Sequence, residues 1–291
     1  MTTQQLILSL VLATMVFSVA LELRVADFAR VVETPRAVIC GLIPQFVLLP
    51  GATWLATLAL DLPANIEAAM ILVAACPGGS LSNVITHFGR GNTALSVSIS
   101  AVASVMALVL TPFNFAWMMA TNPATAGWMR SLSIDASDIW WSLLALLALP
   151  MALGLTLSHR WPALAETIKR PFGTFSLLAL LAFIAVGMVV QRALLNAQIL
   201  PQLGIVILHN ASGLFLGWLC ALAFRVAERD RRAIVIEGGM QNSGLALGII
   251  AVTFNADLGM VVIASLWGMW HIVSGLTLAV AWRMKDARLA H

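Results

Sequence analysis

Two short segments of the chain combine a glycine pair with polar side chains inside otherwise apolar surroundings. One is 76–83, Cys-Pro-Gly-Gly-Ser-Leu-Ser-Asn, and the other is 237–244, Glu-Gly-Gly-Met-Gln-Asn-Ser-Gly. A backbone amide or carbonyl without a partner in hydrocarbon is costly, so such interruptions persist where the freed groups line a cavity or hold an ion. The two segments therefore predict a pair of helix breaks that form a binding site, an arrangement typical of membrane transporters.

The chemistry available at these breaks centres on one carboxylate. Of the 13 acidic residues, we place all but Glu237 in loops or at the ends of apolar spans. An ionisable group within a span is costly and indicates a functional site. The alternative is a surface acid that reaches back to the interface, because Glu237 is only five residues past Arg232. That reading leaves the neighbouring glycines, Gln241 and Asn242 unexplained.

The side chains that can act with Glu237 are oxygen donors, namely Gln45, Ser80, Ser82, Asn83, Ser96, Ser100, Gln241 and Asn242. Oxygen ligands with a single carboxylate suit a hard cation. One negative charge balances one or two monovalent ions better than a divalent ion, so we expect sodium or a proton. Ser96 and Ser100 share a helix face, although that pair taken alone is better explained by helix packing.

The composition predicts a polytopic helical membrane protein. The chain of 291 residues is 60% apolar and 10% charged, against about 45–50% and about 25% in soluble domains. The net charge of +3 follows from Lys and Arg retained in cytoplasmic loops. No basic run is long enough to indicate a nucleic-acid partner. Three cysteines, Cys40, Cys76 and Cys220, are interpreted as reduced core residues.

Apolar segments near the length that crosses a bilayer recur along the whole chain. We place nine spans at about 5–23, 37–60, 65–88, 93–119, 138–158, 172–190, 203–224, 233–254 and 259–282. The expected fold class is therefore an all-α polytopic membrane protein with nine transmembrane helices, and residues 1–291 form one transmembrane unit. Loops are expected at 24–36, 121–138, 159–171 and 225–232, among others.

Basic residues divide unevenly between the two sides of this arrangement. Of the 16 Lys and Arg, only Arg130 and Arg192 fall on one side, and the other 14 fall on the opposite side. The side rich in Lys and Arg is cytoplasmic by the positive-inside rule. We therefore expect a multi-pass protein of the cell (inner) membrane, with the C-terminus in the cytoplasm and the N-terminus outside.

The two interrupted spans are the third and the eighth. Because they lie five spans apart, they cross the membrane in opposite directions, as in an inverted repeat of five spans each. Nine spans are one fewer than ten, so we infer that the first repeat lacks its opening helix.

At this point the sequence resembles the bile acid:sodium symporter family, as a bacterial-type member with nine spans. The motifs that carry the resemblance are 76–84, 90–96 and 237–245, with weaker similarity at 44–46, 208–210 and 270–275. The resemblance covers nearly the whole chain. It implies two crossing discontinuous helices in a core domain (about 37–119 and 203–282) and a panel domain (about 5–36 and 138–190) that move relative to each other.

The resemblance also implies two sodium sites. One would use Ser82, Asn83, Ser96, Ser100 and Glu237, with Ser100 standing where many members have threonine. The second would use Gln45, Glu237, Gln241 and main-chain oxygens near Gly238 and Met240.

The substrate is expected to be a small organic anion in the crevice between the two domains. Helix N-termini favour anions, so the amides around Ser80 and Leu81 are the first candidates for binding a carboxylate. Asn242 is the second and His271 the third, since a lone histidine in a span is as often a packing residue. Ile272 stands where some members have asparagine, so a smaller carboxylate is at least as plausible as a bile acid.

The leading hypothesis is sodium-coupled import of an organic anion, and the first alternative is proton-driven or sodium-independent transport with Glu237 as proton carrier. An intramembrane enzyme is disfavoured because the chain has no His-Glu-x-x-His and no Gly-x-Ser-x-Gly motif, and Cys76 lacks a base nearby in sequence. A channel is disfavoured because no ring of like charges or filter repeat is visible.

Overall fold

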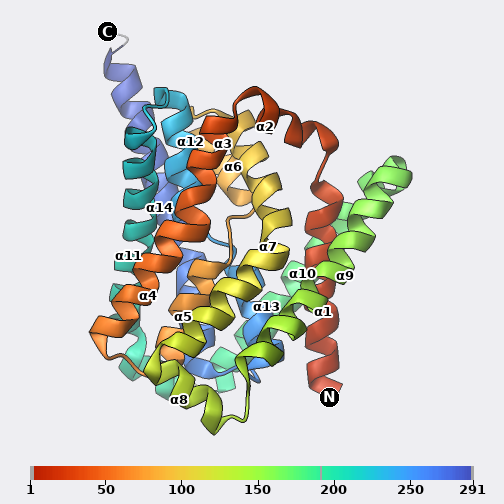
Figure 1. Cartoon of the computed structure of the whole chain (residues 1–291), viewed down its shortest axis with the longest axis vertical. Coiled ribbons are helices and arrows are strands. Elements are labelled where there is room, and N and C mark those ends of the chain that lie inside the picture. The colour runs from red at the N-terminus through yellow and green to blue at the C-terminus, as the bar shows by residue number, and fades with distance from the viewer. Residues whose placement is uncertain (1–2, 191, 290–291) are drawn as a thin grey trace.

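The structure, a computed structural model, describes residues 3–190 and 192–289, and this part of the chain is helical without a strand (Figure 1). Side chains at 1–5, 8, 25, 26, 29, 30, 176, 177, 180, 181, 183, 184, 186–198, 290 and 291 are outside the description. The elements are α1 (Thr3–Glu22), η1 (Val25–Phe28), α2 (Ala29–Glu33), α3 (Pro35–Ile43), η2 (Pro44–Leu48), α4 (Leu49–Leu60), α5 (Ala64–Ala75), α6 (Leu81–Phe88), α7 (Thr93–Thr121), α8 (Pro123–Ser131), α9 (Ala136–Arg160), α10 (Pro162–Val190), α11 (Arg192–Ala223), α12 (Glu228–Gly239), α13 (Ser243–Thr253) and α14 (Leu258–Leu289).

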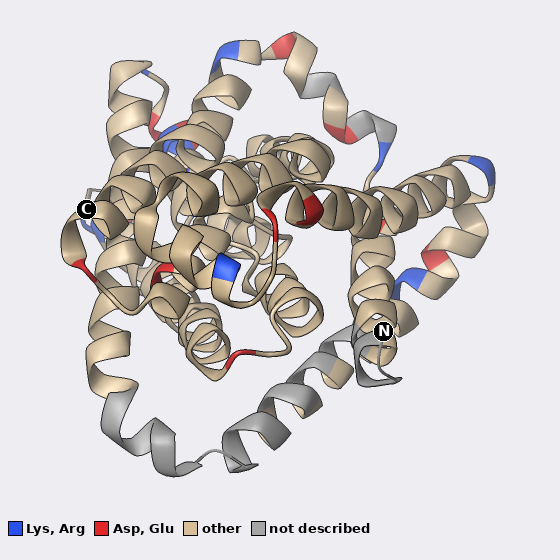
Figure 2. Cartoon of the chain, turned by 60° about the horizontal axis from the view of Figure 1, so that its bottom comes forward, with Lys and Arg blue, Asp and Glu red and all other residues tan. Residues whose placement is uncertain are grey.

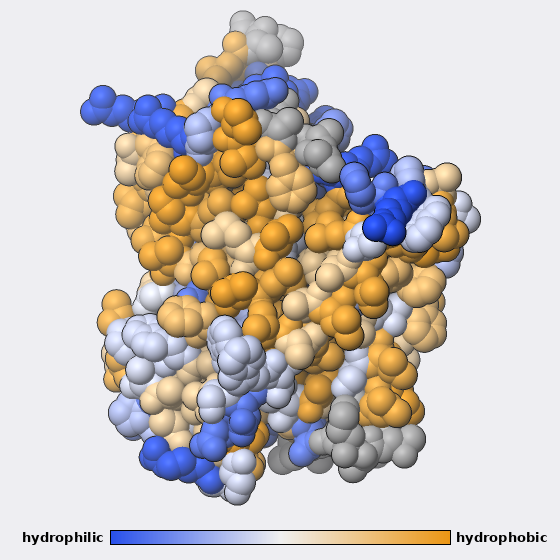
Figure 3. All heavy atoms as spheres, turned by 45° about the vertical axis from the view of Figure 1, so that its right-hand side comes forward, coloured by the Kyte–Doolittle hydropathy of each residue, from blue (hydrophilic) through white to orange (hydrophobic). Residues whose placement is uncertain are grey.

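Six helical stretches of the described residues are long and apolar enough to cross a membrane. They correspond to the predicted spans at 37–60, 93–119, 138–158, 203–224, 233–254 and 259–282. The other three predicted spans fall on α1, on α5 with α6, and on α10; much of the predicted span 172–190 has side chains outside the described residues. Figure 3 shows an apolar band on this face, with hydrophilic residues gathered above and below it.

Both predicted helix breaks are present. The first separates α5 from α6 at 76–80, and the second separates α12 from α13 at 240–242. They contact each other, because the amide of Asn242 donates a hydrogen bond of 3.0 Å to the carbonyl of Pro77. The side chain of Asn242 also caps α13 by accepting from the amide of Leu245 at 2.9 Å. The hydroxyl of Thr111 on α7 donates to the freed carbonyl of Ala75 at 2.7 Å, so neighbouring helices satisfy the interrupted backbone.

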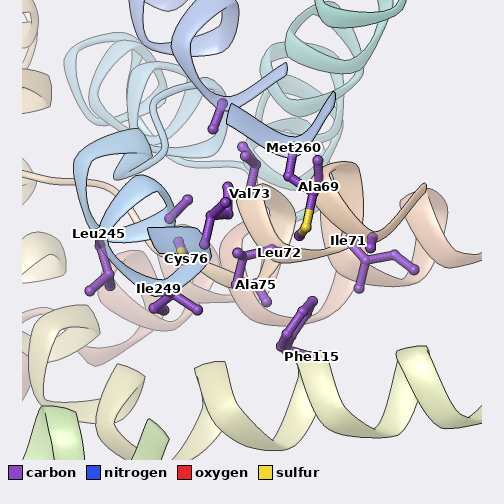
Figure 4. Packing of buried hydrophobic residues seen from close by; sticks show 14 of the residues in the cluster. Ala69, Ile71, Leu72, Val73, Ala75, Cys76, Phe115, Leu245, Ile249 and Met260 are labelled. Carbon is purple, nitrogen blue, oxygen red and sulfur yellow. The ribbon is translucent and has the colours of Figure 1, made fainter. Parts of the chain in front are cut away.

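Helix α5 lies in the centre of the largest apolar core. Its residues from Ile66 to Ala75 are all buried, as expected of a helix surrounded by others. Phe115 of α7, Leu245 and Ile249 of α13, and Met260 of α14 pack around it (Figure 4). This packing fixes the end of α5, and therefore the first break, relative to α7 and α13.

Helix α11 packs against the backbone of α12 through small residues. Gly213 and Gly217 form a Gly-x-x-x-Gly motif that allows helices in a membrane to approach closely. A Cβ atom at Gly213 would lie 2.5 Å from the carbonyl oxygen of Gly238, and one at Gly217 would lie 2.9 Å from that of Ile234. The close contact holds α12 in place just before the second break.

Several predicted loops contain helix. The loop expected at 159–171 is almost entirely helical, because α9 continues through Arg160 and α10 begins at Pro162 and continues through Pro171; proline is favoured at the first helical position. The loop expected at 121–138 contains α8, whose start at Pro123 is capped by the side chain of Asn122. The loop expected at 225–232 is also shorter than predicted, since α12 begins at Glu228.

The span at 37–60 contains a π-helical turn, η2, that the apolar pattern of the segment does not predict. It begins at Pro44, which has no amide hydrogen to continue the ladder of helical hydrogen bonds. π turns of this kind are often found at functional sites. Here the turn carries Gln45, which is fully buried.

Glu67 lies at the end of a span, as predicted, in the first turn of α5, and it is fully buried there. Its Oε1 accepts from the amide of Leu62 at 3.1 Å, and its Oε2 accepts from Nδ2 of Asn122 at 2.9 Å. Asn122 also donates to the hydroxyl of Thr57 at 3.1 Å. Through these hydrogen bonds Glu67 connects the end of α4, the start of α5 and the turn between α7 and α8.

The uneven distribution of basic residues is visible in space. Figure 2 is turned so that the α8 end comes forward, and most of the blue Lys and Arg ribbon lies away from that end. The N-terminal end of α1 and helix α8 lie at the bottom of Figure 1, whereas the C-terminal end of α14 lies at the top with the start of α12. Arg30 and Arg192, both counted in the prediction of orientation, have side chains outside the described residues.

The packing of α11 on α12 predicts that Gly213→Ala destabilises the protein. Its methyl group would overlap the Gly238 carbonyl, and overpacking of this kind costs about 1–3 kcal/mol. Gly204→Ala is the matched control on the same helix, because no atom lies within 4 Å of its Cβ position. Thermal unfolding in detergent should show a lower Tm for Gly213→Ala and an unchanged or higher Tm for Gly204→Ala. Equal Tm values would contradict this account of the contact.

Candidate ion and substrate site

Glu237 lies near the end of α12, directly before the second break, and is fully buried. Its Oε1 accepts hydrogen bonds from three hydroxyl groups: Ser82 at 2.6 Å, Ser96, and Ser100 at 3.1 Å. Ser82 lies in the first turn of α6, and the other two serines lie one turn apart on α7. Helix α12 therefore presents the Glu237 carboxylate to α6 and to α7.

Asn83 completes this group. Its Oδ1 lies 2.8 Å from the hydroxyl oxygen of Ser96 and 3.3 Å from that of Ser100, so each hydroxyl, which has one hydrogen, can donate either to Asn83 or to Glu237. The structure thus brings together all five residues of the first predicted set, from three helices. No group of three His, Cys, Asp or Glu side chains is gathered anywhere in the described chain. The chemistry here is that of hydroxyl, amide and carboxylate oxygens around a single negative charge, which suits a hard monovalent cation.

Part of the second predicted set lies on the other side of the same carboxylate. Gln45 donates from Nε2 to Oε2 of Glu237 at 3.3 Å and accepts at Oε1 from the amide of Gly78 at 3.2 Å. A Cβ atom at Gly78 would lie 2.8 Å from the carbonyl oxygen of Met240 and 3.2 Å from Oε2 of Glu237. Gln45, Glu237 and the Met240 carbonyl therefore gather around Gly78.

Gln241 and Gly238 are arranged differently. Gln241 donates to the carbonyl oxygen of Gly238 at 3.4 Å, and that carbonyl faces Gly213 on α11. The Oε1 atom of Gln241 is buried without a hydrogen-bond partner, which leaves one oxygen of this set available to a ligand. Among the described residues a hydrogen bond links these two residues to each other, and none links either of them to Gln45.

Two positions that matter to the site were not singled out as ligands. Gly78 must lack a side chain so that the two breaks can meet, and Asn210 on α11 donates to the carbonyl of Gly239 at 2.7 Å. The glycine pair in the sequence indicates that Gly78 is part of a break, but it does not predict the contact of Gly78 with Glu237. The contact of Asn210 depends on which face of α11 meets α12. The spacing of residues alone does not specify that face.

The predicted substrate residues divide into two groups. Ser80 and Asn242 line a cavity of about 110 Å³ together with Gly78, Gly79 and Glu22 of α1. A smaller apolar pocket of about 40 Å³ adjoins it through shared lining residues and is bounded by side chains of α1, α7 and α9. The cavity therefore lies between the breaks and α1, and Asn83 and Ser100 of the ion site also line it.

Leu81 and His271 are not among the residues that line this cavity in the described chain. Leu81 contributes the first residue of α6, with a partly exposed side chain. His271 is buried on α14, where its ring packs edge-on against Trp267 at 5.2 Å. Trp267 in turn donates to His209, whose other ring nitrogen contacts the hydroxyl of Thr53 at 2.8 Å. The ring contact favours a packing role for His271, although its Nδ1 is buried without a hydrogen-bond partner in the described chain.

Comparison with known proteins agrees with the geometry. The model of the sodium bile acid symporter family matches residues 9–198. A sodium-dependent transporter of Bacillus subtilis (strain 168), YocS, is 31% identical over 96% of this chain and 83% of its own length. The ileal sodium/bile acid cotransporter of Homo sapiens is 27% identical over 86% of this chain and 70% of its own length. A probable chloroplastic sodium/metabolite cotransporter of Arabidopsis thaliana, BASS1, is 28% identical over 90% of this chain and 63% of its own length.

The chain belongs to the sodium bile acid symporter family. It is a multi-pass membrane transporter of a sodium-coupled family and not an enzyme.

The contact between the breaks predicts that Gly78→Ala weakens sodium binding. Its methyl group would push against the Met240 carbonyl and the Glu237 carboxylate. Gly79→Ala is the matched control, because the nearest atom to its Cβ position is 3.7 Å away. We expect the sodium concentration that half-maximally raises the Tm to increase at least about tenfold for Gly78→Ala, which corresponds to about 1.4 kcal/mol, and to stay near wild type for Gly79→Ala. A tenfold change in both variants would show that the contact at Gly78 is not the cause.

Proposed function

We propose that this protein is a symporter that imports a small organic anion together with sodium ions by alternating access. The observation that carries the proposal is the buried group of Ser82, Asn83, Ser96, Ser100 and Glu237, assembled where two interrupted helices meet. Hydroxyl and amide oxygens around one carboxylate match the preferences of a hard cation, and freed backbone groups are available beside them.

Hydrogen-bond partners on both carboxylate oxygens of Glu237 support two sodium ions. The first ion would be held by the serine hydroxyls, Asn83 and Oε1 of Glu237. The second would use the oxygen of Gln45, Oε2 of Glu237, the Met240 carbonyl and, after a local rearrangement, Gln241 and the Gly238 carbonyl. Two monovalent charges against one carboxylate leave a single positive charge, which attracts an anionic substrate into the adjoining cavity.

The cavity favours a substrate with a single negative charge. Helices α6 and α13 both begin beside it, and their N-terminal amides and dipoles attract a carboxylate. The hydroxyl of Ser80 and Nδ2 of Asn242, which lies near Gly79, are hydrogen-bond donors on residues that line the cavity. The described lining includes two acids, Glu22 and Asp27, and no Lys or Arg, which would repel a polyanion. A small monocarboxylate therefore fits better than a larger or more highly charged ion.

The transport cycle would use the division into two domains. In this proposal, helices at about 5–36 and 138–190 form the panel, and those at about 37–119 and 203–282 form the core. The cavity lies between α1 of the panel and the breaks of the core, so a movement of one domain against the other would open it to each side in turn. Nine spans, with the N-terminus outside and the C-terminus in the cytoplasm, complete the proposed architecture.

Uptake into proteoliposomes tests this function directly. With an inward sodium gradient, uptake of a suitable carboxylate should rise over that in potassium, and Glu237→Gln should abolish the increase because the ion loses its balancing charge. Glu33→Gln removes an exposed acid at the end of α2 and should leave uptake unchanged. Candidate carboxylates are chosen by thermal-shift screening in sodium against potassium.

The driving ion is the point at which the proposal can fail. If a proton gradient without sodium drives uptake and Glu237→Gln abolishes it, the protein is a proton-coupled transporter with Glu237 as carrier. If Glu237→Gln folds and retains full sodium-dependent uptake, the buried carboxylate is not part of the ion site.

A further inference from the structure

A second cavity, of about 630 Å³, is lined by the last turn of α6, the first turns of α7 and α12, and the last turns of α14, and it shares no lining residue with the substrate cavity. This volume is within the range of roughly 300–1,000 Å³ found for small-molecule sites. Its lining is dominated by charged side chains: Arg90, Arg229, Arg232, Arg283, Glu228 and Asp286. Four guanidinium groups and two carboxylates leave an excess of two positive charges.

Arg232 uses both acids of the cavity. It is buried, and it donates to the two carboxylate oxygens of Asp286 at 2.6 Å and 2.8 Å and to Glu228 at 3.3 Å. It also donates to the carbonyl of Gly89 at 3.1 Å and lies over the ring of Trp282 at 5.5 Å. The carboxylates of Glu228 and Asp286 therefore neutralise the charge of Arg232. Its contacts with Gly89 and Asp286 hold the ends of α6 and α14 against α12.

The other three guanidinium groups keep unused donors. Arg229 makes no salt bridge with a carboxylate of the described chain. Arg283 donates one N–H to the carbonyl of Phe88 at 3.3 Å, and Arg90 reaches Asp286 only at 3.9 Å with a half-exposed side chain. They come from three separate elements: the turn after α6, the first turn of α12 and the last turns of α14. The bias of basic residues toward one side explains their presence, but not their convergence on one cavity.

An exposed aromatic side chain lies beside one of these arginines. The guanidinium of Arg283 is 4.9 Å above the ring of Phe88, which is 39% exposed. A group with a phosphate and attached apolar chains meets both features, because arginine pairs well with phosphate oxygens and basic pockets between transmembrane helices bind anionic lipid headgroups.

We propose that this cavity binds the phosphate of an anionic phospholipid headgroup through Arg90, Arg229 and Arg283. The lipid would connect α6, which carries Ser82 and Asn83, with α12, which carries Glu237. The bound lipid would therefore stabilise α6 at its C-terminal end and α12 at its N-terminal end. This site is separate from the proposed transport function and can be tested without any transport measurement.

The test compares lipids on the purified protein in a neutral detergent. Phosphatidylglycerol should raise the Tm and remain bound in native mass spectrometry, whereas phosphatidylcholine should do neither. The double variant Arg229→Gln/Arg283→Gln should need at least tenfold more phosphatidylglycerol for the same effect. The matched control Lys285→Gln/Arg288→Gln removes the same charge from the end of α14 but not from the cavity lining, and it should behave as wild type.

Three outcomes overturn the proposal. Equal effects of the two lipids on the wild type, which require no variant, would exclude a preference for the anionic headgroup. Equal losses in the two double variants would indicate general surface charge. A Tm increase with inorganic phosphate alone, equal to that with phosphatidylglycerol, would assign the cavity to a soluble phosphate instead of a lipid.

Discussion

The burial of the Glu237 carboxylate is the interaction on which the arrangement of the core depends. A charge removed from water requires hydrogen bonds or an opposite charge, and an isolated carboxylate in an apolar interior is strongly unfavourable. The structure supplies three serine hydroxyls and the amide of Gln45, from α6, α7 and η2. Four segments that are distant in sequence are thus held together by one side chain, and the same oxygens are suited to a cation.

This arrangement requires interrupted helices and small residues. The carboxylate reaches its partners only because the two breaks lie against each other. Gly78 lies beside the carbonyl of Met240, and the amide of Asn242 donates a hydrogen bond to the carbonyl of Pro77. Helix α12 is held in turn by Gly213 and Gly217 of α11, which approach its backbone directly. Each glycine is needed at a point where a Cβ atom would separate two backbones, so the group around Glu237 depends on helix packing that extends well beyond its hydrogen-bond partners.

The two fully buried acids of the described chain differ in the donors they meet. Glu67 is bound by an amide nitrogen of the backbone and by the side-chain amide of Asn122, and nitrogen donors cannot turn an oxygen lone pair toward a cation. Most of the donors to Glu237 are hydroxyl groups, which donate to a carboxylate and can also present lone pairs to an ion. The donor type therefore separates a structural acid from one suited to ion binding.

The sequence predicts the membrane class and the positions of both helix breaks, because apolar length and glycine-polar interruptions are local signals, and its selection of Glu237 as an ion ligand stays a prediction. It did not reveal the π turn at Gln45, the burial of Glu67, helix α8 or the helical start of α10. The assembly of Ser82, Asn83, Ser96 and Ser100 around Glu237 was expected from family resemblance, and spacing alone could not have produced it. Only the tertiary structure decided which oxygens share one carboxylate, why Gly78 must be glycine, and that His271 packs against Trp267 away from the cavity. Those features depend on contacts between helices far apart in the chain, and a local pattern cannot specify them.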